Sequence, residues 1–139
     1  MKAAVIYTSL TGNTEIMAEC IYKAYREKNG PESAELFPAG SITPDKALDY
    51  GILILGCPAM GSEVLEEEIF EPFFSGIEPG IKGKKVALFG SYGWGDGQWM
   101  RDWEERCRAA GAEVAETLIV HETPEPQDLE KCVEFAGKI

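Results

Sequence analysis

Short apolar runs are spaced along the chain, and turn-forming residues separate them. Their length and their content of aliphatic and β-branched residues predict β-strands at Lys2–Thr8, Ser33–Phe37, Gly51–Gly56, Lys84–Gly90 and Glu113–Val120. The first, third and fourth runs are the most apolar, which is typical of strands buried on both faces. The second and fifth runs contain more polar residues, so we expect these two strands at the edges of a sheet.

Between the strands, apolar residues recur at helical spacing. This pattern predicts a first helix that ends near Asn29-Gly30, and further helices at Glu63–Ser75, Gln98–Ala110 and Glu125–Gly137. Pro72 is expected to interrupt or shift the second helix. The stripes predicted to face the core are Ile16, Met17, Cys20, Ile21, Ala24 and Tyr25 in the first helix, Trp99, Met100, Trp103, Cys107 and Ala110 in the third, and Leu129, Cys132, Val133 and Ala136 in the last.

The alternation of strands and helices predicts a single α/β domain over residues 1–139. We expect a doubly wound, five-stranded parallel sheet with strand order 2-1-3-4-5 and helices on both faces. In such sheets ligands bind beyond the carboxyl ends of the strands, where the strand order reverses. The loops that follow Thr8, Gly56 and Gly90 are therefore the predicted location of a functional site.

The loop after the first strand is rich in hydroxyl groups and leads directly into a helix. Backbone N–H groups and the positive end of the helix dipole favour an anion such as phosphate there. No Lys or Arg occurs between Lys2 and Lys23, and the pattern of a Walker loop is absent, so neutral donors would hold the anion. The alternative is a simple helix N-cap formed by Thr11 or Asn13.

The other two loops carry side chains suited to a flat ligand. Met60 lies in the loop of residues 56–61, and Trp94 lies among four glycines in residues 90–97. An aromatic side chain on a glycine-rich loop beside an anion site favours a planar, phosphorylated cofactor. The alternatives are a turn with Met60 folded back on the core and a purely structural third loop. Cys57 has no visible source of activation as a nucleophile.

Charge and composition exclude several classes of function. The 139 residues include 24 Asp and Glu against 13 Lys and Arg, a formal net charge of −11. Nucleic-acid backbones and anionic membrane surfaces would repel such a chain. No apolar run approaches the roughly 20 residues that span a bilayer, and no signal-peptide pattern is recognisable. The four scattered cysteines and single His predict reduced thiols, a cytoplasmic protein and no metal site.

Taken together, the three loops resemble those of the flavodoxin family, in particular its short-chain bacterial type. Residues 9–15 are similar to the family's S-x-T-G-N-T phosphate loop, and residues 56–61 and 90–97 resemble the two loops that flank its flavin ring. The similarity in order and spacing extends over essentially the whole chain. It implies that the cofactor is FMN, bound non-covalently.

The resemblance also implies roles for individual residues. Backbone N–H groups and hydroxyls of the first loop would wrap the FMN phosphate. Met60 would cover one face of the isoalloxazine ring, and Trp94 would stack on the other. Gly61 would offer its carbonyl to N5 of the reduced flavin, and Glu63 would accept a hydrogen bond from N3–H. The predicted cofactor-binding residues are Ser9, Leu10, Thr11, Gly12, Asn13, Thr14, Pro58, Ala59, Met60, Gly61, Glu63, Ser91, Tyr92, Gly93, Trp94, Asp96 and Gly97.

The implied function is that of a low-potential one-electron carrier. Its FMN would cycle between semiquinone and hydroquinone, and electrons would pass between redox proteins without any catalytic residue. The alternative is an FMN-dependent quinone or NAD(P)H oxidoreductase of the same fold, although no insertion or basic nicotinamide-phosphate site is recognisable. A signalling receiver domain would need an acidic pair after the first strand, where this chain has Tyr7, Thr8 and Ser9.

A run of carboxylates indicates the kind of partner. Six Glu residues and no Lys or Arg occur between Glu63 and Glu78, and the run begins at the predicted flavin loop. We therefore predict transient docking of a monomer to redox proteins with basic faces. The alternative is a solvated helix face without a partner.

Overall fold

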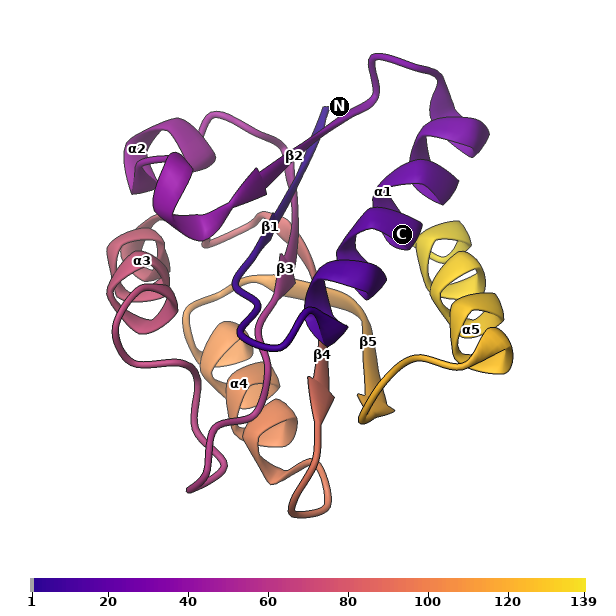
Figure 1. Cartoon of the computed structure of the whole chain (residues 1–139). Coiled ribbons are helices and arrows are strands. Elements are labelled where there is room, and N and C mark those ends of the chain that lie inside the picture. Colours follow the sequence, from indigo (N-terminus) through magenta and orange to yellow (C-terminus); the bar gives the residue numbers. More distant parts are fainter. Residues whose placement is uncertain (1) are drawn as a thin grey trace.

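A five-stranded parallel sheet forms the centre of the computed structural model, which describes residues 2–139 (Figure 1). The strand order is β2-β1-β3-β4-β5, as predicted. Each strand lies within two residues of its predicted bounds, and the two more polar strands occupy the edges. The strands are β1 (Ala3–Tyr7), β2 (Ala34–Pro38), β3 (Ile52–Gly56), β4 (Lys85–Tyr92) and β5 (Glu113–His121).

Helices cover both faces of the sheet because the central strands are apolar on both sides (Figure 1). Val5 of β1 belongs to the core cluster under α1 and α5, whereas the next residue, Ile6, belongs to the cluster under α2, α3 and α4. Both side chains are fully buried. The helices are α1 (Asn13–Asn29), α2 (Pro44–Ala47), α3 (Phe70–Ile77), α4 (Gln98–Ala109) and α5 (Pro126–Gly137).

The second predicted helix begins seven residues later than expected, at Phe70 instead of Glu63. The backbone before it is held in another shape, because the Glu66 carboxylate accepts hydrogen bonds from the N–H groups of Glu68, Ile69 and Phe70. Pro72 lies in the first turn of α3, where a missing N–H costs little, so it does not interrupt the helix.

Three further expectations were incomplete or wrong. The short helix α2 and two 3₁₀ turns, at Ala39–Ser41 and Glu78–Gly80, were not predicted. Val133 of α5 is 53% exposed, because the buried arc of that helix is centred on Cys132, Phe135 and Ala136. Ile16 of α1 is also exposed. Within residues 2–139, no helix is both long enough and apolar enough to cross a membrane.

Candidate functional site

All three predicted loops lie at the carboxyl edge of the sheet and meet there. A cavity of about 310 Å³ is lined by ten of the predicted site residues, namely Leu10, Thr11, Asn13, Pro58, Ala59, Met60, Gly61, Ser91, Tyr92 and Gly93. Ser9 and Gly12 line a neighbouring cavity of about 410 Å³ on the other side of the first loop. The structure thus brings together residues that are 80 positions apart in the sequence.

The first loop presents backbone donors at the start of α1. The Ser9 hydroxyl oxygen accepts hydrogen bonds from the N–H groups of Gly12 and Glu15, both at 3.2 Å. Gly12 has a φ of 94°, a conformation that glycine adopts without strain. Among the described residues, none accepts a hydrogen bond from the N–H groups of Leu10, Thr11, Asn13 or Thr14. This donor set at a helix N-terminus fits a phosphate group.

A buried hydroxyl pair joins the first loop to the third. Thr14 Oγ1 and Ser91 Oγ lie 2.7 Å apart, and the Ser91 N–H also donates to Thr14 Oγ1 at 3.4 Å. Both residues are almost fully buried. Thr14 lines neither of the two cavities, and its hydroxyl already has a protein partner in Ser91.

The second loop is a closed turn. The Met60 N–H donates to the Val64 carbonyl at 3.0 Å, and the Glu63 N–H donates to the Met60 carbonyl at 2.7 Å. Gly61 lies outside the left-handed region, and a Cβ there would meet nothing within 4 Å. The positive φ of this turn falls at Glu63 instead, at 53°. Gly61 is therefore free of steric restraint at the exposed tip.

Glu63 links the second loop to the third. Its carboxylate accepts a hydrogen bond from the N–H of Gln98 at 3.0 Å, at the N-terminus of α4, where the helix dipole favours a negative charge. The same carboxylate lies over Gly95, whose Cβ, if present, would be 2.4 Å from it. Gly95 has a φ of 86°, which favours glycine at that position, and Glu63 does not line the 310 Å³ cavity.

The three tryptophans differ as the sequence predicted. Trp94, at the tip of the third loop, is 67% exposed, whereas Trp99 and Trp103 of α4 are both 1% exposed. Asp96 forms an exposed ion pair with Arg101 at 2.9 Å, and Gly97 (φ 96°) is the N-cap residue of α4. Neither Asp96 nor Gly97 lines the 310 Å³ cavity, so the predicted cofactor-binding residues include some that lie outside it.

Two residues at the end of β5 also lie at the site, and no motif in the sequence marks them. Glu122 lines the cavity with a φ of 59°, which is unusual for a residue with a Cβ. His121 Nε2 lies 3.3 Å from the Gly93 carbonyl oxygen, and its ring is 5.0 Å from that of Tyr92. These two residues could have been predicted from the rule that ligands bind at the carboxyl ends of parallel strands, because β5 also ends at this edge.

The cysteines do not offer a nucleophile. All four are free, and Cys57, at the start of the second loop, is fully buried. Burial raises the pKa of its thiol strongly, and burial also raises the pKa of Cys107 and of Cys132 to about 12. Within residues 2–139, no group of three or more His, Cys, Asp or Glu side chains is arranged to hold a metal ion.

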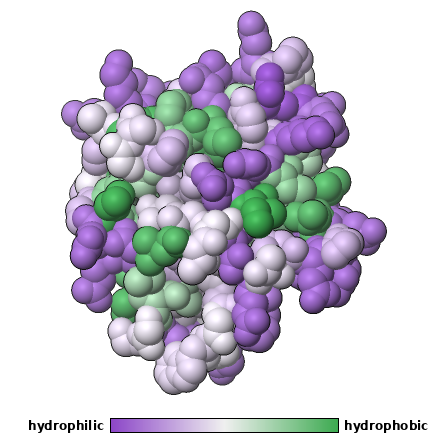
Figure 2. Space-filling model, viewed as in Figure 1, coloured by the Kyte–Doolittle hydropathy of each residue, from purple (hydrophilic) through white to green (hydrophobic). Residues whose placement is uncertain are grey.

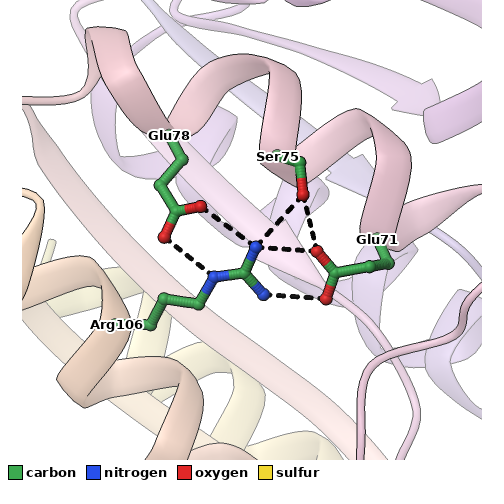
Figure 3. A network of polar contacts seen from close by, with 4 residues as sticks. All are labelled: Glu71, Ser75, Glu78 and Arg106. Atoms are coloured by element: carbon green, nitrogen blue, oxygen red, sulfur yellow. Dashed lines mark hydrogen bonds and ion pairs between the residues drawn. The ribbon is translucent and has the colours of Figure 1, made fainter.

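The run of six carboxylates is only partly exposed. Glu66 is 5% exposed and caps the backbone before α3. Glu71 and Glu78 are half-buried and bind Arg106 of α4 at 2.7 and 2.8 Å (Figure 3). Glu67 and Glu68 are exposed beside the second loop.

Comparisons with known proteins agree with this geometry. The model of the family described as flavodoxin matches residues 5–135. The chain is 52% identical over 136 residues to a flavodoxin of Clostridium beijerinckii, covering 97% of this chain and 96% of that one. The chain belongs to the flavodoxin family. A second flavodoxin, from Megasphaera elsdenii, is 46% identical over 121 residues, which cover 87% of each chain.

The solution structure of two-electron reduced Megasphaera elsdenii flavodoxin has the same fold. It superimposes with a TM-score of 0.87 and covers 99% of both chains at 42% identity. As a flavodoxin, the present chain is an FMN-containing, low-potential electron carrier and an electron-transfer protein rather than an enzyme. The alternative of an FMN-dependent oxidoreductase is therefore set aside.

Proposed function

We propose that residues 1–139 form one FMN-binding domain and that its cofactor lies across the three loops at the carboxyl edge. The observation that carries this proposal is the set of N–H groups of Leu10, Thr11, Asn13 and Thr14, which have no acceptor within residues 2–139 and lie beside a cavity that all three loops line. Ser9 to Thr14 would receive the phosphate. Met60 and Trp94 would enclose the ring, with Pro58, Ala59, Gly61, Glu63, Ser91, Tyr92, Gly93, Asp96 and Gly97 around it.

When bound, FMN would supply the one-electron chemistry. The chain's own residues set the surroundings of the ring. Met60 and Trp94 would exclude water from its faces, and the exposed Gly61, where a Cβ would meet nothing within 4 Å, would leave its carbonyl able to turn toward the ring. Glu63, Glu67, Glu68 and Glu122 add negative charge around the site, which opposes further reduction and keeps the potential low.

The test of this site is the contribution of the phosphate to binding. We expect FMN to bind at least 100-fold more tightly than riboflavin, about 2.7 kcal/mol, because riboflavin leaves the donors of residues 10–14 unused. Titration of the flavin-free protein with each compound, followed by flavin fluorescence, measures both dissociation constants. Equal affinities would show that the first loop does not receive the phosphate.

For the partners, we propose transient docking of redox proteins with basic faces to the exposed rim of the site. Glu67, Glu68 and Glu122 supply exposed carboxylates there. One face of the molecule shows hydrophobic patches separated by hydrophilic side chains (Figure 2). Exposed apolar side chains of the loops and of the segment before α3 would add to the docking surface. These apolar residues are Leu10, Val64, Ile69 and Trp94. We further propose that the protein acts as a monomer in the cytoplasm, where its four thiols stay reduced.

The docking proposal predicts a strong salt dependence. The rate of electron transfer to a basic redox protein is expected to fall as salt rises, because the Debye length shrinks from about 10 Å at 0.1 M to about 3 Å at 1 M. Replacing Glu67 and Glu68 together with Gln is expected to lower the rate at low salt several-fold. The control replaces Glu130 and Glu134, two exposed residues of α5, with Gln. A rate that is flat in salt, or equal in both double variants, would contradict this docking surface.

A further inference from the structure

Glu66 is a buried carboxylate that the cofactor site does not use directly. It is 5% exposed, although its neighbours Glu67 and Glu68 are exposed. One carboxylate oxygen accepts hydrogen bonds from the N–H groups of Ile69 and Phe70, both at 2.9 Å, and the other accepts from Glu68 at 2.6 Å. This side chain therefore satisfies three backbone donors where α3 begins.

The backbone of Glu66 is bound at two further points. Its N–H donates to the sulfur of Cys57 at 3.3 Å, and its carbonyl accepts from the Glu71 N–H at 2.8 Å. Cys57 is fully buried directly after β3. The segment of residues 58–65 is thus a loop whose two ends meet at the contact between Cys57 and Glu66.

The charge state of Glu66 suits this structural position. Burial by itself would raise the pKa of the carboxyl, but the three backbone N–H donors outweigh burial and hold this pKa below its ordinary value. Glu66 is therefore ionised at neutral pH. Its charge faces the N-terminal end of α3, where a negative charge is stabilised.

We propose that Glu66 is a positioning residue that fixes the second loop, residues 58–65, against the flavin ring and thereby sets the potential of the bound cofactor. This inference rests on the proposed function, in which Met60 and Gly61 contact the ring. Loss of the carboxylate contacts would free the backbone of residues 66–70, which carries the Glu66 N–H that closes the loop on Cys57. The Gly61 carbonyl would then be less well placed, so the first one-electron step would become harder.

The experiment compares Glu66→Gln with Glu67→Gln, since both remove one negative charge at adjacent positions. Glu67→Gln is expected to raise the first reduction potential slightly and to change the FMN dissociation constant less than threefold. Glu66→Gln is expected to lower that potential and to raise the dissociation constant at least tenfold. Glu66→Asp keeps the charge but shortens the side chain, so it is expected to shift both quantities in the same direction by less.

The outcome separates positioning from charge and from stability. If the potentials of both Glu66 variants match wild type or follow Glu67→Gln, the proposal is overturned, even where the variants unfold more easily. If Glu66→Gln does not fold, Glu66→Asp decides in the same way. Failure of the wild-type protein and of Glu67→Gln to bind FMN would instead contradict the proposed function, not the role of Glu66.

Discussion

Replacing Trp103 with alanine is expected to lower the free energy of unfolding by about 3–5 kcal/mol. The Trp103 ring is fully buried and meets the rings of Phe70 and Phe74 edge-on, at centroid distances of 5.3 and 6.0 Å. Alanine would leave a large cavity between α3 and α4, which the two helices cannot close without breaking other contacts. Urea unfolding of the flavin-free protein, followed by circular dichroism, measures the effect.

Two variants serve as controls for this prediction. Trp103→Phe keeps an aromatic ring and removes an indole N–H that has no partner among the described residues. We therefore expect it to lower the free energy of unfolding by less than half as much as Trp103→Ala. Trp94→Ala should change the stability of the flavin-free protein by no more than about 0.5 kcal/mol, because Trp94 is exposed, but it should weaken FMN binding. The reverse pattern would show that the roles of Trp94 and Trp103 are exchanged.

The fold was predictable because its signals are local. Apolar runs such as Ile52–Gly56 are too short for helices and too apolar for an exposed edge, and their alternation with helical segments leaves few topologies. The three loops were predictable for a related reason. Consecutive small and hydroxyl residues, or a Trp among glycines, have few purely structural uses.

The features that the sequence did not reveal depend on contacts between distant residues. The carboxylate run contains no Lys or Arg, yet Glu71 and Glu78 bind Arg106, which lies 28 residues beyond the end of the run. Glu66 is buried and Glu67 is exposed because their side chains point in different directions. The helix predicted over Glu63–Ser75 could not give these directions, since the actual helix begins at Phe70. Glu122 reaches the site because β5 ends beside β4, and no motif marks it.

Removing Arg106 is the second change with a large expected effect. Its guanidinium group makes two hydrogen bonds to each of Glu71 and Glu78 and contacts Ser75 (Figure 3). The same group lies 4.7 Å from the centre of the Phe74 ring. All these contacts join α4 to α3 or to the turn that follows it. Arg106→Met keeps much of the aliphatic length but leaves two half-buried carboxylates without a cation.

We expect Arg106→Met to cost about 2–3 kcal/mol of unfolding free energy at pH 7. Removing one partner of a fully buried pair costs about 3–5 kcal/mol, and the side chains here are about one-third exposed, so solvent screening reduces the loss. Arg108→Met is the matched control on the same helix. Within residues 2–139, the one ion pair of Arg108 is with Glu104, four residues before it, and it is largely exposed, so we expect Arg108→Met to lower the free energy of unfolding by about 0.3–0.5 kcal/mol.

The difference between wild type and Arg106→Met should also depend on pH. Hydrogen bonds from Arg106 lower the pKa of Glu71 in the folded protein, so the folded pKa lies below the unfolded value of about 4.3. The contribution of this pair is therefore complete above about pH 5 and is lost as the pH falls through the folded pKa. Urea unfolding of both proteins between pH 3 and 7 tests this, and a difference that stays constant over the range would show that Arg106 acts through packing on Phe74 rather than through its charge.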